Sequence, residues 1–279
     1  MNSKSAAKIG GIAAIAAAVA VAVWIGTQQS DSAQSNVSML GTGTDVSKVE
    51  TSTVEYYNNT SGFLAKPAGD GRYPGIVMIH EWWGLNDNIK DMARQMASEG
   101  YVVLAADLYK GQVATESSQA QPLAAGVRNN PGEAVKNVQA AVSYLRNSDS
   151  VGGNKVGSLG WCFGGDWSLQ LALNEKMDAT GIYYGRLVTD PEALSVIKWP
   201  VLGVFGSADQ SIPVEQVNAF KQALDKNGIE NEVYIYEGVG HAFANPSGAN
   251  YAPEETKDAW QKTLAFFDKH LKGEEVTAA

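Results

Sequence analysis

The chain has 279 residues, a formal net charge of −9 at pH 7 and a pI near 4.9. This acidic balance, without any evident basic patch, argues against nucleic-acid binding. The sequence contains one cysteine, which excludes an intrachain disulfide and any zinc site built from cysteines.

The N-terminal region carries a long uncharged apolar stretch, Ile9 to Gly26, preceded by two lysines. Its length is near the shortest that spans a bilayer, so residues 1–27 are predicted to be a signal peptide or an N-terminal membrane anchor. We favour an uncleaved anchor, because the stretch is long for a signal peptide and Asp31-Ser32-Ala33 is an imperfect cleavage pattern. A helix of a globular core is the alternative, but no polar residue would give it a solvent-facing side. We therefore expect the rest of the chain to be exported, either anchored and facing outward or secreted after cleavage.

Residues 28–52 are rich in Ser, Thr, Gln, Asn and Gly and predict a flexible linker. In residues 53–273, strand-like apolar runs alternate with helix-like runs, and residues 274–279 form a C-terminal tail. The strand-like runs cover residues 54–64, 75–79, 101–106, 155–159, 181–184, 201–205 and 232–236, and the helix-like runs cover residues 88–99, 131–146, 163–173, 214–227 and 253–271. This alternation predicts one α/β domain with a mainly parallel central sheet and helices on both faces. Residues 111–130 are polar and contain Pro122, which fits a mobile flap and a plain surface excursion equally well.

The most informative stretch is Gly160-Trp161-Cys162-Phe163-Gly164, which lies between a strand-like run and a helix-like run. It has the pattern of a nucleophile elbow, a tight turn whose glycines let the backbone close up and leave the central side chain exposed. A thiol at a helix N-terminus faces unpaired N–H groups and the positive end of the helix dipole, which favour the thiolate and can hold an oxyanion. A lone cysteine is most often a small buried hydrophobe, but this context predicts that Cys162 is a nucleophile.

Two partners follow Cys162 in the order expected of an α/β-hydrolase triad, which is nucleophile, acid and histidine. Asp209 and His241 each lie in a glycine-rich loop after a later strand-like run, where side chains can converge on the elbow. The alternative for Asp209 is a turn former or a helix cap. Among the three histidines, His80 could simply close a strand and His270 fits surface packing near the end of the terminal helix. His241 is the histidine at the triad position, so we predict a triad of Cys162, Asp209 and His241.

Glu81 follows the first strongly apolar strand-like run, in the loop that supplies the second oxyanion N–H group in this fold. A glutamate there could pair with the thiol or with the histidine and control which of them carries the proton. Without the context of Cys162, Glu81 would be interpreted as an ordinary solvated loop residue.

The segments H-E-W-W-G-L-N, G-W-C-F-G-G, G-S-A-D and G-V-G-H-A-F occur in this order and together resemble the dienelactone hydrolase family, over roughly Val54 to Leu271. The resemblance implies an α/β-hydrolase fold and ester hydrolysis through a thioester acyl-enzyme. It also implies the roles of the site residues: Cys162 as nucleophile, Asp209 as triad acid, His241 as general base and acid, and Glu81 as a glutamate that keeps the thiol quiescent until substrate displaces it. The backbone N–H groups of Trp82 and Phe163 would form the oxyanion hole.

The chain departs from the family pattern where the family binds the substrate carboxylate with arginines. Lys110 follows the D-L-Y sequence, and Asn245 closes the segment that begins at His241. Lys110 can replace a charge but not the bidentate geometry of arginine, and Arg186 is a second candidate anion contact. The neighbouring Trp82 and Trp83 favour an aromatic or apolar acyl pocket, with Trp83 as a candidate substrate contact. We therefore predict a broader carboxylester hydrolase for small esters or lactones, aromatic ones included, which prefers them to long-chain lipids.

Other function classes stay open. A thioesterase or a peptidase would share the fold and the triad, and a catalytically inactive, membrane-tethered binding domain would share the fold alone. The presence of Cys162, Asp209, His241 and Glu81 together argues against the inactive domain. No nucleotide-binding glycine pattern opens a helix and no H-E-x-x-H motif is present, so we expect neither a cofactor nor a metal. The expected partners are a small-molecule ester and, through an uncleaved anchor, the membrane; the expected oligomeric state is a monomer.

Overall fold

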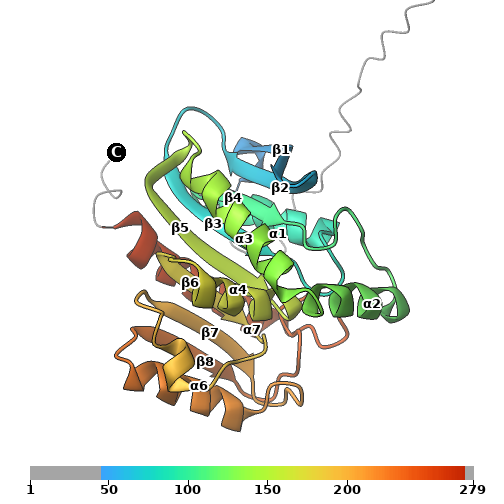
Figure 1. Cartoon of the computed structure of the whole chain (residues 1–279), viewed down its shortest axis with the longest axis vertical. Helices are drawn as coiled ribbons and strands as arrows, with labels where there is room; N and C mark the ends of the chain where they lie inside the picture. Colours follow the sequence, from blue (N-terminus) through green and yellow to red (C-terminus); the bar gives the residue numbers. More distant parts are fainter. Residues whose placement is uncertain (1–44, 274–279) are drawn as a thin grey trace, which may run out of the picture. The chain divides into compact units, whose positions relative to one another are not determined.

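The structure, a computed structural model, describes residues 45–273. The predicted signal peptide or anchor, most of the predicted linker and the C-terminal tail lie outside these residues. In the described part, eight strands form one sheet in the order β1-β2-β4-β3-β5-β6-β7-β8 (Figure 1). Strand β2 is antiparallel to both of its neighbours, and the other neighbouring pairs are parallel. The strands are β1 Val49–Tyr57, β2 Thr60–Pro67, β3 Tyr73–Ile79, β4 Val102–Ala106, β5 Val151–Trp161, β6 Ala179–Tyr183, β7 Val201–Gly206 and β8 Asn231–Tyr236.

Helices pack on both faces of this sheet (Figure 1). Helices α1 and α7 pack against one face, and α2, α3, α4 and α6 contribute to the clusters on the other. The helices are α1 Asp87–Ser98, α2 Ser117–Arg128, α3 Pro131–Arg146, α4 Phe163–Asn174, α5 Pro191–Leu194, α6 Val214–Lys226 and α7 Pro253–Phe267, with a 3-10 turn η1 Val46–Lys48 and a π-helical turn η2 Asp268–Lys272. The predicted fold class, a mainly parallel sheet with helices on both faces, is confirmed.

Alternate side chains of the central strands build the two main cores. In β3, Ile76 and Met78 pack toward α1 and α7, Val77 and Ile79 pack toward α3 and α4, and all four side chains are fully buried. Complete burial of one such side chain contributes about 1.5–3 kcal/mol. A strand that is buried on both faces needs apolar residues at consecutive positions, which is why β3 is recognisable as an unbroken apolar run in the sequence.

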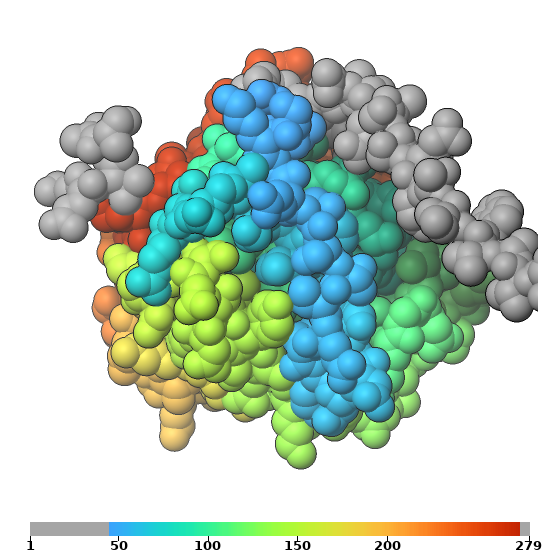
Figure 2. All heavy atoms as spheres, turned by 90° about the horizontal axis from the view of Figure 1, so that it is seen from above, coloured from blue at the N-terminus to red at the C-terminus, as the bar shows by residue number. Residues whose placement is uncertain are grey.

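The first predicted strand is in fact a hairpin. Residues 54–64 were expected as one run, but the chain turns at Asn58 and Asn59, whose φ angles are 39° and 59°. Positive φ at both central residues matches a type I′ turn, which asparagine tolerates and which suits the twist of paired strands. Strand β1 also begins at Val49, before the predicted domain boundary at residue 53, because its first residues pair with the end of β2. The hairpin lies at the surface of the face shown in Figure 2, where β1 is blue.

Residues 111–130 contain a regular helix, α2, which was not among the predicted helices. Pro122 lies inside α2, while Ala120 and Ala124 are buried. Proline has no backbone N–H, so Pro122 removes one hydrogen bond from the helix. The packing of Ala124 in the apolar cluster beneath α3 and α4 offsets this loss. Within residues 45–273, no helix combines the length and the apolar character needed to cross a bilayer.

The register of the parallel strands brings their carboxyl ends to one edge of the sheet. The aligned pairs at this edge are Ile79 with Gly160, Trp161 with Tyr183, Tyr183 with Val204, and Gly206 with Tyr236. Ligands bind at this edge in open α/β sheets. The loops that leave it carry the predicted site residues, namely Glu81 after β3, Cys162 after β5, Asp209 after β7 and His241 after β8.

Candidate active site

Cys162, His241 and Asp209 form a continuous chain of side-chain contacts. His241 Nε2 lies 3.1 Å from Cys162 Sγ, and His241 Nδ1 lies 2.7 Å from Asp209 Oδ2. Because an ionised carboxylate only accepts hydrogen bonds, we assign a proton to Nδ1, which leaves Nε2 to exchange a proton with the sulfur. Residues from three separate loops are thus placed where a proton can pass directly between Sγ and Nε2.

Cys162 occupies a strained turn between β5 and α4. Its φ of 53° and ψ of −115° are unusual for a residue other than glycine, and its N–H donates to Tyr183 O at 2.9 Å. A Cβ on Gly160 would lie 2.1 Å from Gly164 O, and a Cβ on Gly164 would lie 2.1 Å from Ile79 O. The turn therefore closes only with glycine at both positions, and the backbone strain at Cys162 costs about 1–3 kcal/mol that the surrounding packing offsets. This turn holds the half-buried thiol at the N-terminus of α4.

Asp209 is fixed by burial and by its own loop. Its side chain is fully buried, and Oδ1 accepts hydrogen bonds from the N–H groups of Ser211 at 2.8 Å and Ile212 at 3.1 Å, which leaves Oδ2 for His241. Burial by itself lowers the pKa of His241, but its hydrogen bonds to Asp209 and Cys162, together with the negative charge there, raise the pKa to about 10. The raised pKa of His241 favours its imidazolium form at neutral pH, and a cation beside a cysteine sulfur favours the thiolate.

Glu81 is buried beside this chain of contacts but is not hydrogen-bonded to the thiol. Its Oε2 accepts a hydrogen bond from Asn245 Nδ2, and its Oε1 accepts one from the Tyr184 hydroxyl at 3.5 Å. Across residues 45–273, no hydrogen bond joins Glu81 to Cys162. Burial raises the pKa of Glu81 to about 7, although His241, Asn245 and Tyr184 partly oppose the shift. The carboxyl group can therefore gain or lose a proton close to neutral pH.

Two backbone N–H groups in the loops around Cys162 have no acceptor. In the part of the chain that the structure describes, neither the Trp82 N–H nor the Phe163 N–H donates a hydrogen bond to a protein atom. Trp82 follows β3 in a tight turn, which the Gly84 N–H closes on Glu81 O at 3.2 Å. Phe163 is the first residue of α4, where an N–H has no partner within its own helix. Unpaired N–H groups beside a reactive side chain are typical of an oxyanion hole.

The four residues predicted to bind substrate lie at different depths, and none of them hydrogen-bonds to Cys162, His241 or Asp209 within residues 45–273. Asn245 is buried and donates to Glu81, so its amide is already engaged. Trp83 is half-buried, with its ring centroid 5.0 Å from that of Trp82. Lys110 and Arg186 are exposed, and Lys110 lines a hollow of about 580 Å³ bordered by α2 and α3.

Two further residues at the site escaped prediction. Tyr184, directly after β6, donates to Glu81 and sets its ring edge-on to the His241 ring at a centroid distance of 5.3 Å. The position of Tyr184 directly after a central strand is the feature of the sequence that could have identified it as a site residue. Arg128, the last residue of α2, holds its guanidinium carbon 5.3 Å from the centre of the Phe163 ring. Arg128 could not be placed at the site without knowing that its segment is a helix.

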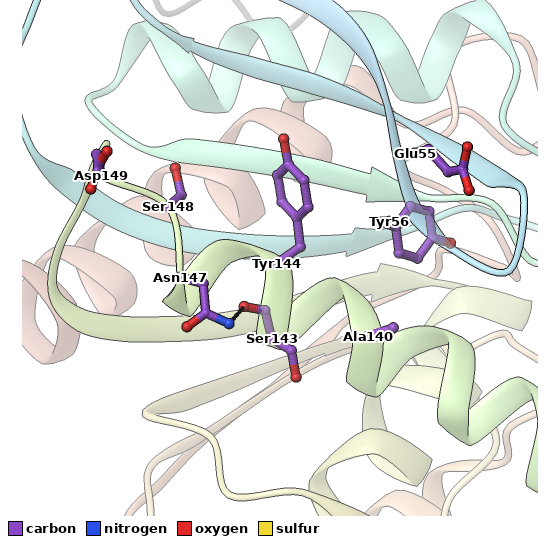
Figure 3. Close-up of a pocket in the computed structure, with 8 residues that line it drawn as sticks. All are labelled: Glu55, Tyr56, Ala140, Ser143, Tyr144, Asn147, Ser148 and Asp149. Atoms are coloured by element: carbon purple, nitrogen blue, oxygen red, sulfur yellow. Dashed lines mark hydrogen bonds between the residues drawn. The ribbon is translucent and has the colours of Figure 1, made fainter.

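A second hollow, of about 650 Å³, lies between β1 and α3 (Figure 3). Its lining includes Glu55 from β1, Tyr144 from α3 and Asp149 from the turn after α3. It contains no nucleophile paired with a base, so we place the chemistry at Cys162 rather than in this hollow. Among residues 45–273, no group of three or more His, Cys, Asp or Glu side chains is arranged to hold a metal ion.

Replacing Glu81 with glutamine is expected to stabilise the protein at neutral and alkaline pH. The ordinary pKa of 4.5 rises to about 7 in the folded state. Between pH 4.5 and about pH 7 the folded protein therefore binds more protons than the unfolded chain, and it loses stability as the pH rises. Glutamine does not titrate. The free energy of unfolding of the variant, relative to wild type, should therefore increase by about 2–3 kcal/mol between pH 5 and pH 8. Urea unfolding at the two pH values measures this change, and a pH-independent difference would contradict an ionising buried Glu81.

Comparison with known proteins gives the family. Residues 60–271 match the model of the dienelactone hydrolase family. The chain is 32% identical over 228 residues to Protein usf of Aquifex pyrophilus, a match that covers 78% of this chain and 98% of that protein. It is also 32% identical over 222 residues to a Methylorubrum extorquens protein named "Putative carboxymethylenebutenolidase", covering 75% of this chain and 76% of that protein.

Solved structures agree with this assignment. The crystal structure of a "Putative Dienelactone Hydrolase" from Klebsiella pneumoniae is 25% identical and matches with a TM-score of 0.70, covering 79% of this chain and 99% of that one. The family match spans all four motifs on which the resemblance was based, so the family prediction is confirmed. This chain therefore belongs to the dienelactone hydrolase family of the α/β-hydrolase superfamily and is a hydrolase of that family.

Proposed function

We propose that this chain is a carboxylic ester hydrolase in which Cys162 forms a thioester acyl-enzyme. The observation that carries the proposal is the chain of contacts from Cys162 Sγ to His241 Nε2 at 3.1 Å and from His241 Nδ1 to Asp209 at 2.7 Å. The unpaired N–H groups of Trp82 and Phe163 lie in the two adjoining loops. A nucleophile, a base, an orienting carboxylate and an oxyanion site are the parts that acyl transfer requires.

Acylation starts at the Cys162 sulfur, whose proton is held by His241 Nε2. Sγ bonds to the ester carbonyl carbon, and the carbonyl oxygen becomes an oxyanion that accepts hydrogen bonds from the Trp82 and Phe163 N–H groups. Asp209 keeps the imidazolium oriented through its bond to Nδ1–H. The carbon–oxygen bond then breaks, the leaving oxygen takes the Nε2 proton, and the acyl group remains on Cys162 as a thioester.

Deacylation reverses these roles with water in place of the alcohol. Neutral Nε2 of His241 accepts a proton from water while the water oxygen attacks the thioester carbon. The same N–H groups hold the second oxyanion, and the carbon–sulfur bond breaks to release the acid. The thiolate of Cys162 is then left beside the imidazolium, as at the start, and one ester and one water have become one acid and one alcohol.

A thiol nucleophile favours esters whose leaving group is a stable anion. In the tetrahedral adduct a thiolate leaves more readily than an ordinary alkoxide, so a simple alkyl ester mostly returns to the starting material. A phenolate or an enolate competes well with the thiolate. Enol lactones and aryl esters are therefore the substrate class we propose, and the name of the Methylorubrum extorquens relative, "Putative carboxymethylenebutenolidase", supports a lactone. The paired rings of Trp82 and Trp83 support a small aromatic or apolar acyl group.

A substrate panel tests this proposal. We expect aryl acetates and butyrates to be hydrolysed at least ~10-fold faster, in kcat/KM, than ethyl esters, long-chain aryl esters and anilides. The matched control is Cys162→Ser. In its tetrahedral adduct the serine alkoxide leaves no more readily than the alkoxide of an ethyl ester. The preference for aryl over ethyl esters should therefore shrink in that variant. A faster rate on anilides would point to a peptidase. No turnover of any ester, thioester or amide would point to an inactive domain.

We also propose that the domain is exported, on the basis of the apolar stretch within residues 1–27. The mass of the mature N-terminus, determined separately for membrane and soluble fractions, distinguishes an uncleaved anchor from a cleaved signal peptide.

A further inference from the structure

The peptide unit between Glu81 and Trp82 is held from its carbonyl side. The Glu81 carbonyl oxygen lies 2.5 Å from His80 Nδ1 and also accepts the Gly84 N–H at 3.2 Å. In a trans peptide the C=O and N–H groups point in opposite directions. Fixing the Glu81 carbonyl therefore fixes the direction of the Trp82 N–H, which is one of the two unpaired N–H groups around Cys162.

The hydrogen-bond partners of His80 define its tautomer. Nε2 lies 3.1 Å from the Leu108 backbone nitrogen and accepts its N–H, so Nε2 carries no proton. The single ring proton is then on Nδ1, where it is donated to the Glu81 carbonyl. Burial lowers the pKa of His80, and neither that hydrogen bond nor the nearby Asp107 reverses the shift. His80 is thus a neutral ring whose one donor and one acceptor are both used.

The ring of His80 is held in place by the elbow that carries Cys162. It is fully buried, nearly parallel to the Phe163 ring at a centroid distance of 5.7 Å, and 4.6 Å from the Tyr109 ring. Phe163 supplies the other unpaired N–H group. A Cβ on Gly164 would lie 2.6 Å from His80 O, so the backbone of His80 also abuts the elbow. One residue therefore contacts both loops that present an unpaired N–H group.

We infer that His80 is a positioning residue of the oxyanion hole: its Nδ1–H holds the Glu81–Trp82 peptide so that the Trp82 N–H faces the substrate oxyanion. This inference rests on the proposed function of the Cys162 site. Without the Nδ1 donor, the Glu81 carbonyl keeps only its bond to Gly84, and the peptide can rotate and turn the Trp82 N–H away. His80 then does more than close β3, which was its expected role.

Two substitutions separate positioning from packing. His80→Asn places an amide N–H₂ near the position of Nδ1 and loses the acceptor for Leu108. His80→Gln keeps an amide near the position of Nε2, where its oxygen can accept the Leu108 N–H, but it has no donor at the Nδ1 position. Glutamine fills more of the buried space than asparagine, so a packing role predicts that His80→Gln is the milder change. A positioning role predicts the opposite order.

The full chain and both variants are assayed with p-nitrophenyl acetate, and alkylation of Cys162 by iodoacetamide is measured in parallel. Alkylation needs the thiolate and His241 but no oxyanion hole, so it reports whether the rest of the site is intact. We expect His80→Gln to lower kcat about 30- to 100-fold with KM nearly unchanged. We expect His80→Asn to stay within ~5-fold of wild type, and all three proteins to be alkylated at the same rate.

Any of three results would overturn the inference. The first is a wild-type kcat in His80→Gln, and the second is a greater loss of kcat in His80→Asn than in His80→Gln. The third is a loss of hydrolysis that is matched by an equal loss of alkylation. If His80→Gln does not fold, His80→Phe takes its place with the same expected loss, since phenylalanine fills the ring's space without a donor. Cys162→Ala is assayed alongside. Hydrolysis that survives Cys162→Ala refutes the proposed function itself, whereas Cys162-dependent hydrolysis that His80→Gln leaves unchanged refutes the role of His80 alone.

Discussion

Cys162→Ala is expected to lower kcat/KM for p-nitrophenyl acetate by about 10⁴-fold or more. Alanine removes Sγ, the atom that lies 3.1 Å from His241 Nε2, and leaves no group that can form an acyl-enzyme. The unpaired N–H groups and the binding surface remain and support only a small residual rate. Alanine keeps the Cβ, so the backbone strain at φ 53° is unchanged and the free energy of unfolding should stay close to that of wild type.

Initial rates together with urea unfolding curves check this expectation. Iodoacetamide provides an independent readout, because Cys162 is the single cysteine in the chain and any alkylation reports on it alone. Wild type pre-treated with iodoacetamide should lose activity in proportion to the fraction alkylated. Activity of Cys162→Ala within tenfold of wild type would show that another residue is the nucleophile.

Asp209→Asn is expected to lower kcat about 10³- to 10⁴-fold while the protein stays folded. Asparagine keeps an oxygen for the N–H groups of Ser211 and Ile212, but it turns an N–H₂ toward His241 Nδ1. Nδ1 must then accept, so the ring proton moves to Nε2 and the ring can no longer take a proton from Cys162. The pKa of His241, held at about 10 partly by Asp209, should fall at the same time.

The rate of Cys162 alkylation measures this second effect, since the thiolate is the form that reacts and an imidazolium beside it favours the thiolate. With less imidazolium beside the sulfur at neutral pH, Asp209→Asn should be alkylated more slowly than wild type at pH 7. Asp258→Asn is the matched control, because Asp258 pairs with Lys262 on α7 and has no contact with the site in the described residues. A loss in Asp209→Asn no greater than in this control would exclude Asp209 as the orienting carboxylate.

Much of the fold was predictable because its central strands are buried on both faces. The run from Gly75 to Ile79 is apolar at consecutive positions. Helix α3 matched its predicted ends, where Pro131 opens the helix and Arg146 closes it. The hairpin escaped prediction because β1 is mostly exposed and polar, so its pattern does not separate it from the turn at Asn58 and Asn59. Helix α2 escaped because it buries only two alanines and contains a proline.

The location of the candidate site could be predicted from order and spacing, because each motif follows a strand of a mainly parallel sheet. The further contacts around the predicted triad could not be inferred. Glu81 is hydrogen-bonded to Asn245 and Tyr184, residues distant in sequence, and nothing in its own loop indicates this. His80 looked like the end of a strand, since its two hydrogen bonds are made to backbone atoms whose positions depend on the whole fold.

The most direct test of a cysteine acyl-enzyme is the mass of the enzyme during turnover. Wild-type protein is mixed with p-nitrophenyl butyrate, quenched with acid at short times and digested, and the peptide that contains Cys162 is analysed by mass spectrometry. We expect one butyryl group on Cys162, which forms with the burst of p-nitrophenol, decays at the rate of kcat and is absent from Cys162→Ala. Steady turnover without this adduct, or with the butyryl group on another residue, would contradict Cys162 as the nucleophile.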